Sequence, residues 1–119
     1  MTRLSCLILS IALVAPTLAA PMSNKLLSTS DLLQNGHEAQ MLNAQFATAS
    51  PSDSCNGTEN ACIDGQFAQC SSGAWVLTDC PGNLQCFALP LVNKKGTTIT
   101  CDSKSDAAAR IKQTGAKGG

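Results

Sequence analysis

Cysteine is the residue type with the greatest chemical potential in this chain. Seven cysteines occur in 119 residues, and six of them follow residue 54: Cys55, Cys62, Cys70, Cys80, Cys86 and Cys101. The closest two, Cys80 and Cys86, have five residues between them, so no Cys-x-x-Cys pair typical of a structural zinc site is present. We expect these six cysteines to form three disulfides and to hold no metal or cofactor.

The other reactive side chains do not form a catalytic set. His37 is the only histidine, and a solvated surface position outside the cysteine-rich region is its simpler interpretation. Serine-type catalysis needs a base held beside its nucleophile, and a glycosidase needs two carboxylates about 5–10 Å apart. Asp64 and Asp79 could be neighbours, but in a small stapled domain surface or turn positions are their more common role. We expect that the protein is not an enzyme.

Trp75, the only tryptophan, is the side chain best suited to binding a ligand. An indole ring presents an apolar face on which a sugar ring can stack, and nearby amides and hydroxyls can orient the sugar. Gln69 and Phe67, from the preceding strand, and Leu77 are the expected neighbours of Trp75. The chain has three phenylalanines and no tyrosine, so Trp75 could equally serve as the hydrophobic core. The spacing leaves both interpretations open.

Residues 1–19 have the features of a secretory signal peptide. Arg3 precedes an apolar run over 4–14, and small residues lead to a cleavage site after Ala19. The apolar run is too short to span a membrane. Cleavage removes Cys6, so an even number of cysteines remains in a secreted, extracellular chain.

The mature chain is close to neutral. Seven basic residues face eight acidic residues after cleavage, which gives a formal charge of −1. A balance of this kind does not favour nucleic acid or an anionic membrane as a partner. We expect a monomer that has no membrane attachment after signal removal.

Residues 20–54 are expected to form an N-terminal helical segment and a linker. Ser30 is a suitable N-cap, and apolar residues recur on one helical face from Leu32 to Phe46, which predicts a helix over 30–46. The small, polar residues 47–54 are typical of a linker. The helix could pack on the cysteine-rich region, or it could belong to a propeptide or spacer.

The cysteine-rich domain, residues 55–102, is expected to contain two β-hairpins. The first joins 66–70 to 74–80 through the three-residue loop Ser71-Ser72-Gly73, and the second joins 87–92 to 97–101. Pro90 lacks an N–H group, which places its strand at an edge. Pairing of Cys70 with Ala74 would gather four side chains on the hairpin face opposite the cysteines: Phe67, Gln69, Trp75 and Leu77.

Two further signals flank these hairpins. Asn56-Gly57-Thr58 is an N-glycosylation sequon, and we expect a glycan on Asn56. Ser103 begins a capping sequence, so 103–119 is expected to form a short helix and a frayed tail.

The predicted fold is small, disulfide-rich and mainly β, with two short β-hairpins stapled by three disulfides between an N-terminal and a short C-terminal helix.

One motif carries a family resemblance: Ala61-Cys62-x-x-Gly65-x-Phe67-Ala68-x-Cys70-x-x-Gly73-x-Trp75-Val76-x-x-x-Cys80-x-x-x-x-x-Cys86. It resembles fungal carbohydrate-binding module family 19, a chitin-binding domain, and small secreted fungal proteins assigned to that family. The resemblance extends over Cys55–Asp102 and implies chitin or chitooligosaccharide binding outside the cell. The chain departs from the family in having no accompanying chitinase domain, and in Asn83, where the family tends to have glycine.

A weaker likeness to the invertebrate chitin-binding peritrophin pattern implies a disulfide pairing. It implies Cys55–Cys70 and Cys80–Cys101, which leaves Cys62–Cys86. The six cysteines by themselves permit fifteen connectivities.

Two functional hypotheses follow. The first is a secreted, non-catalytic module that binds N-acetylglucosamine polymers at the fungal cell wall or in the extracellular space, with Trp75 as the stacking ring. The alternative is a small disulfide-rich structural or effector-like secreted protein without sugar binding, in which the face that carries Trp75 packs against the N-terminal helix.

Overall fold

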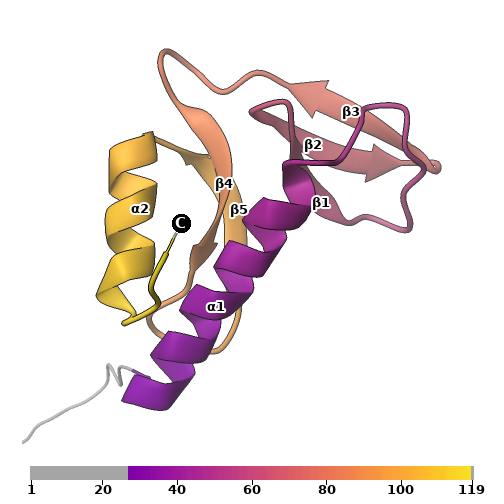
Figure 1. The fold of residues 1–119 in the computed structure, drawn as a ribbon. Coiled ribbons are helices and arrows are strands. Elements are labelled where there is room, and N and C mark those ends of the chain that lie inside the picture. Colours follow the sequence, from indigo (N-terminus) through magenta and orange to yellow (C-terminus); the bar gives the residue numbers. More distant parts are fainter. Residues whose placement is uncertain (1–26, 119) are drawn as a thin grey trace, which may run out of the picture.

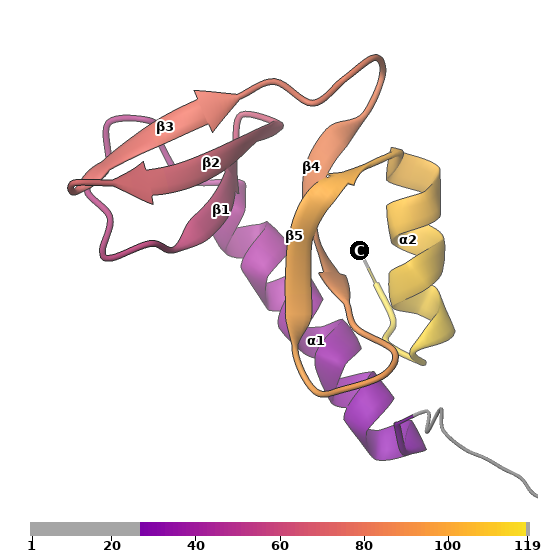
Figure 2. The ribbon, with the colours of Figure 1, turned by 180° about the vertical axis from the view of Figure 1, so that it is seen from behind.

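The computed structural model of the chain describes residues 27–118, so the predicted signal peptide lies outside the described residues. The order of elements is α1 (Thr29–Phe46), β1 (Asn60–Ile63), β2 (Gln66–Ser71), β3 (Ala74–Thr78), β4 (Gln85–Pro90), β5 (Thr97–Asp102) and α2 (Lys104–Gln113). The strands form two antiparallel sheets, β1-β2-β3 and β4-β5. The small, disulfide-rich, mainly β class is confirmed. Figures 1 and 2 show α1 running past both sheets and α2 beside the β4-β5 hairpin.

The three-stranded sheet contains a strand that the sequence analysis did not predict. β1 pairs with β2 through the two-residue turn Asp64-Gly65, and both turn residues have positive φ, 55° and 77°. Positive φ at both central residues is the requirement of a type I′ turn, which matches the twist of the strands it joins. Asp-Gly is the sequence signal for that turn, and it was available in the sequence.

The turn between β2 and β3 overturns the predicted register. It is also a two-residue turn, with positive φ at Ser72 (53°) and Gly73 (81°), and Ser71 pairs with Ala74. The expected three-residue loop would have paired Cys70 with Ala74 instead. Because strand side chains alternate between faces, this shift of one residue moves every β3 side chain to the opposite face of the sheet.

The predicted face of four residues is therefore wrong. Trp75 pairs with Cys70 and Leu77 pairs with Ala68, so Trp75 and Leu77 lie on the inner face with the buried residues. Gln69 instead pairs with Val76, which is 53% exposed and points outward. Phe67 shares that outer side. A helix contributes to the inner side, because Phe46 packs on the cluster of buried residues Ala61, Ile63 and Ala68 together with Ala49, Trp75 and Leu77.

α1 packs against the cysteine-rich region and is held there by two asparagines. The Asn43 side chain donates to Ala88 O (3.0 Å) and accepts from Ala88 N (2.8 Å), as a neighbouring strand would. Asn35 lies eight residues earlier in α1. Its side chain donates to Leu91 O (2.9 Å) and Lys94 O (3.0 Å) and accepts from Gly96 N (2.8 Å). The outer edge of β4 is thus hydrogen-bonded to helix side chains, and the predicted edge position of Pro90 holds, since β4 pairs only with β5.

α1 begins at Thr29, and its N-cap lies two residues before the predicted Ser30. Ser28 is the N-cap, and its hydroxyl accepts from Asp31 N at 3.2 Å. The predicted apolar face is used: Ala39 is fully buried, and Leu33, Leu42 and Phe46 pack around it. The linker that follows α1 is tied to the sheet by a bridge between Ser54 and Ala74.

α2 closes the other side of the β4-β5 hairpin. Ser103 caps it as predicted, accepting from Asp106 N at 3.1 Å. A hydrogen bond with the Asp102 carboxyl lowers the pKa of Asp106 below its ordinary value of 3.8. Desolvation opposes this shift, and the charge and hydrogen bond of Arg110 add to it. Arg110 Nε lies 2.9 Å from Asp106 Oδ2.

The two helices approach closely at Gly36. A β-carbon added at Gly36 would lie 2.0 Å from Thr114 Oγ1 and 3.0 Å from Ala116 Cβ. Thr114 Oγ1 donates to Ile111 O and accepts from Ala116 N, which orders the end of α2.

The tail beyond α2 lies along α1, where the sequence analysis expected a frayed end. Ala116 is 4% exposed. Gln40 Nε2 donates to Lys117 O (2.8 Å) and Gly118 O (3.2 Å). Residue 119 lies outside the described residues.

All six expected cysteines are paired. The disulfides are Cys55–Cys70, Cys62–Cys86 and Cys80–Cys101, which are the pairs implied by the peritrophin resemblance. Cys62–Cys86 joins β1 to β4 and so links the two sheets. Three disulfides are typical of a protein folded in an oxidising compartment.

Candidate functional site

The best candidate site is a groove at the junction of the two sheets and the C-terminal end of α1, which we call the Trp75 groove. Its volume is about 440 Å³, within the range of small-ligand sites. Figure 2 shows the elements that converge there, with β5 beside the three-stranded sheet and α1 behind them. Its apolar lining consists of Leu42, Phe46, Ala49, Ala61, Trp75 and Ile99. Its polar lining consists of Gln45, Asp53, Ser54, Glu59, Asn60 and Thr97.

Trp75 forms part of the groove wall and part of the core at once. Its side chain is half-buried and packs on the cluster under the inner face of the sheet. The remaining surface of the ring borders the groove beside Phe46 and Ala49. A ring fixed on one side and open on the other can stack on an apolar ligand face without losing rotamer freedom on binding.

Amide and hydroxyl groups surround that ring. Gln45 comes from the last turn of α1, Asn60 from the start of β1, and Thr97 from the start of β5. Gln45 and Asn60 are exposed, and Thr97 is half-buried. These side chains offer both donors and acceptors, which suits a ligand with many hydroxyl and amide groups.

Two carboxylates complete the lining, and each is oriented by a backbone hydrogen bond. Asp53 Oδ2 accepts from Ser50 N (2.9 Å), and Glu59 Oε1 accepts from Asn56 N (2.8 Å). In each case the second carboxylate oxygen is left to face solvent or a ligand.

Only part of this site could be predicted from the sequence. Trp75 is in the groove, and Leu77 lies on the same inner face, packed on the core cluster. Phe67 and Gln69 do not join them, because both lie on the outer face. The groove residues of α1 and β5 were missed, and no sequence signal could have found them, since they lie more than 20 residues from Trp75 and meet it only through tertiary packing.

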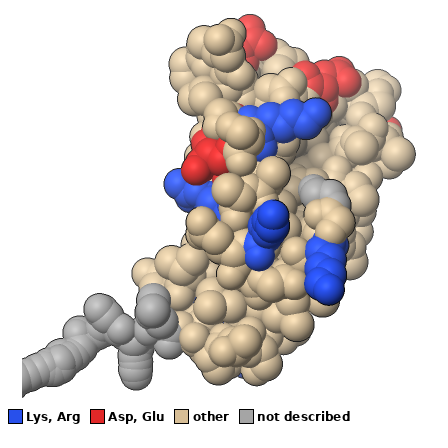
Figure 3. Space-filling view, turned by 60° about the vertical axis from the view of Figure 1, so that its left-hand side comes forward, with Lys and Arg blue, Asp and Glu red and all other residues tan. Residues whose placement is uncertain are grey.

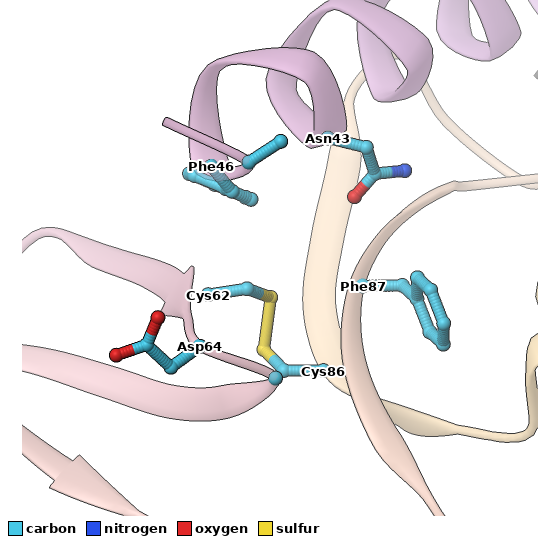
Figure 4. A pocket seen from close by; sticks show the side chains of 8 residues that line it. Asn43, Phe46, Cys62, Asp64, Cys86 and Phe87 are labelled. Carbon is cyan, nitrogen blue, oxygen red and sulfur yellow. A yellow bond between two sulfur atoms is a disulfide. The ribbon is translucent and has the colours of Figure 1, made fainter. Parts of the chain in front are cut away.

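A smaller pocket lies next to this groove and shares Phe46 with it (Figure 4). Asn43 and Phe46 descend from α1 toward the Cys62–Cys86 disulfide, and Asp64 and Phe87 lie on opposite sides of that disulfide. Its volume is about 230 Å³, below the range of ligand sites, and the Asn43 amide is already bonded to β4. This pocket is therefore better explained as packing between α1 and the sheets.

A third hollow, of about 530 Å³, lies between α1, β4 and α2. Its lining is mainly apolar, including Leu32, Pro90, Leu91 and Val92. Its one charged residue, Arg110, lies near two carboxylates, at 2.9 Å from Asp106 and 3.8 Å from Asp102. It lacks the combination of an aromatic ring with several free polar groups that the Trp75 groove has.

Within residues 27–118, the His, Cys, Asp and Glu side chains form no group of three or more that could hold a metal ion. Neither α1 nor α2 has the length and apolar character that a membrane-spanning helix requires. Asn56 is exposed at its turn, and its glycosylation stays a prediction.

The chain has no significant match among protein-family models, curated proteins or solved structures.

Proposed function

We propose that this protein is a secreted, non-catalytic module that binds chitin or chitooligosaccharides in the Trp75 groove, at the fungal cell wall or in the extracellular space. The observation that carries the proposal is the half-buried Trp75 ring, fixed by the core on one side and bordered on the other by amides and hydroxyls. An N-acetylglucosamine unit has an apolar C–H face for the ring and hydroxyl and acetamido groups for the polar rim.

Two further observations support it. The motif from Ala61 to Cys86 resembles carbohydrate-binding module family 19. The disulfide pairing agrees with the one that a chitin-binding peritrophin pattern implies. Three disulfides are also compatible with an extracellular location, to which the predicted signal peptide would direct the chain.

The register of the sheet changes which residues carry the binding. In the proposed site, Trp75 acts with Gln45, Asn60 and Thr97, on the inner side of the sheet. Phe67 and Gln69, which the sequence analysis placed beside Trp75, lie on the other face and have no role in this groove.

A specific observation also favours the second function, a structural or effector-like protein without sugar binding. Trp75 packs with Phe46 and Leu77 on the buried cluster, so a purely structural role would account for its position. Substitution of an exposed polar residue at the rim of the groove distinguishes the two functions. It should weaken sugar binding if the groove binds sugar, whereas a structural role depends only on the buried side of the Trp75 ring.

Retention on chitin beads tests the proposal. We expect the wild-type protein to be retained, and Gln45→Ala and Asn60→Ala to weaken retention without lowering stability, because both side chains are exposed. Trp75→Ala should abolish retention, and Trp75→Phe, which keeps a ring in the core, should leave part of it. Val76→Ala, at an exposed neighbour on the outer face, is the matched control and should bind as the wild type does.

The outcomes separate the two functions. No retention of the folded wild-type protein would refute chitin binding and favour the structural function. Retention that survives both Gln45→Ala and Asn60→Ala, but is lost in Val76→Ala or Gln69→Ala, would move the site to the outer face of the sheet.

A further inference from the structure

Charge is unevenly distributed along this chain and over its surface. Between Lys25 and Lys94 the sequence contains no lysine or arginine. The described basic residues all follow residue 93: Lys94, Lys95, Lys104, Arg110, Lys112 and Lys117. Figure 3 shows Lys and Arg side chains on the face that carries α2, with Asp and Glu side chains among them. The half of the molecule that forms the three-stranded sheet and its linker is therefore purely acidic.

Two of the carboxylates of this acidic half line the Trp75 groove. They are Asp53, from the linker, and Glu59, from the turn before β1. No lysine, arginine or histidine lines the groove beside them. The ion pairs of the described cations are formed elsewhere, by Lys95 with Asp31 and by Arg110 with Asp102 and Asp106.

Both groove carboxylates are held in place by short turns. Because Ser50 N and Asn56 N each bind one carboxylate oxygen at 2.9 and 2.8 Å, the other oxygen of each group has a restricted position. A carboxylate accepts charge-assisted hydrogen bonds from the hydroxyl groups of either ligand, so these do not distinguish a neutral sugar from a charged one. Only an ammonium group adds the attraction between two opposite charges.

We propose that the Trp75 groove prefers partly deacetylated chitin, in which glucosamine units carry a protonated amine in place of the acetamido group. Trp75 stacks on the sugar ring, and Asp53 and Glu59 receive the ammonium. This inference rests on the proposed function, since it concerns the ligand class of the same groove. It also implies that acidic polysaccharides are repelled by the groove.

Titration with two matched ligands tests the preference. Chitohexaose and its fully deacetylated counterpart are titrated into the intact protein by calorimetry, in mildly acidic, low-salt buffer that keeps the amines protonated. Exposed ion pairs have modest strength, so we expect the deacetylated ligand to bind roughly threefold to tenfold more tightly. Added salt should reduce that ratio, because it screens exposed charges.

Isosteric variants assign the effect to the two carboxylates. The double variant Asp53→Asn, Glu59→Gln keeps the oxygen that accepts from each turn N–H, so it should fold. Its affinity for the deacetylated ligand is compared with its own affinity for the acetylated ligand, and that ratio should fall to roughly one. Asp64→Asn, at an exposed carboxylate outside the groove, is the control and should leave the ratio unchanged.

The possible failures are distinguishable. Equal affinity of the wild type for both ligands, or a preference that the double variant keeps, would overturn this inference and leave chitin binding intact. Binding of neither ligand would overturn the proposed function itself.

Discussion

Replacing Gly36 with alanine should destabilise this protein, although alanine is the better helix former. Gly36 lies in the interior of α1, where Gly→Ala alone would stabilise a helix by about 1 kcal/mol. The added β-carbon, however, would lie 2.0 Å from Thr114 Oγ1 and 2.9 Å from Thr114 Cβ. No carbon can occupy that position unless the end of α2 moves away from α1.

The cost of that movement can be worked from the contacts. Overpacking of a filled interface costs about 1–3 kcal/mol. Displacing Thr114 also disturbs its two hydrogen bonds, to Ile111 O and from Ala116 N, which contribute about 1 kcal/mol each. After the helix gain of about 1 kcal/mol is subtracted, we expect Gly36→Ala to lose about 2–4 kcal/mol of unfolding free energy. For a domain of this size, that lowers the melting temperature by roughly 10–20 °C.

Chemical denaturation followed by circular dichroism measures this difference, with disulfides intact in both proteins. A double-mutant cycle with Thr114→Gly assigns it to the contact, since Thr114→Gly removes both Oγ1 and Cβ. We expect Gly36→Ala to cost at least about 1 kcal/mol less in that background. A Gly36→Ala protein as stable as the wild type, or more stable, would refute the reasoning, because helix propensity would then outweigh the interface.

Three further predictions concern other contacts. Asn43→Ala leaves the buried backbone of β4 without its partner, so it should cost about 2–4 kcal/mol in a denaturant titration, whereas Asn83→Ala, at an exposed turn, should cost little. Replacing Cys62 and Cys86 by alanine opens a loop with a sequence separation of 24, which should cost about 3–3.5 kcal/mol and loosen one sheet from the other; unchanged thermal stability would contradict this. The pKa of Asp106 is lowered by folding, so its contribution is present above its ordinary value of 3.8 and is lost as the pH falls through its folded value. Asp106→Asn should thus lower the melting temperature at neutral pH, and a difference that persists in strong acid would exclude this linkage.

Local sequence signals predicted most elements but not their relative positions. The N-cap of α2, the apolar face of α1 and the second hairpin follow from residue spacing over short distances, and the structure has them, although the N-cap of α1 is Ser28 and not Ser30. The pairing of all six cysteines follows from their even number in a secreted chain. β1 was missed because Ala61 and Ile63 lie in a run of only four residues, too short for an alternating pattern to stand out. Its turn signal, Asp64-Gly65, was the better guide.

The register of one turn decided the content of the candidate site. Ser71-Ser72-Gly73 is compatible with a three-residue loop and with a two-residue turn, and the two differ by one residue. Positive φ at Ser72, which serine adopts less readily than asparagine or glycine, selects the shorter turn. That single choice separates Trp75 from Phe67 and Gln69.

Apart from the disulfides, the individual side-chain contacts between distant segments could not be predicted from the sequence. Asn35-Gly36 reads as a weakness in a helix, because both residues have low helix propensity. In the structure, Asn35 binds the β4-β5 turn, and Gly36 admits the end of α2, in each case through partners more than 50 residues away. A single sequence contains no signal for such partners.

α1 covers the backbone edge of β4, so the smallest fragment of this chain that can be transferred to another protein has to include α1. A chain that began at Cys55 would contain all six paired cysteines and all five strands. It would also expose the β4 backbone at Ala88 and Leu91, which Asn43 and Asn35 now occupy. Uncovered strand edges recruit strands from other molecules and lead to aggregation. Tandem repeats or fusion proteins built from this module should therefore begin at residue 27, before the helix.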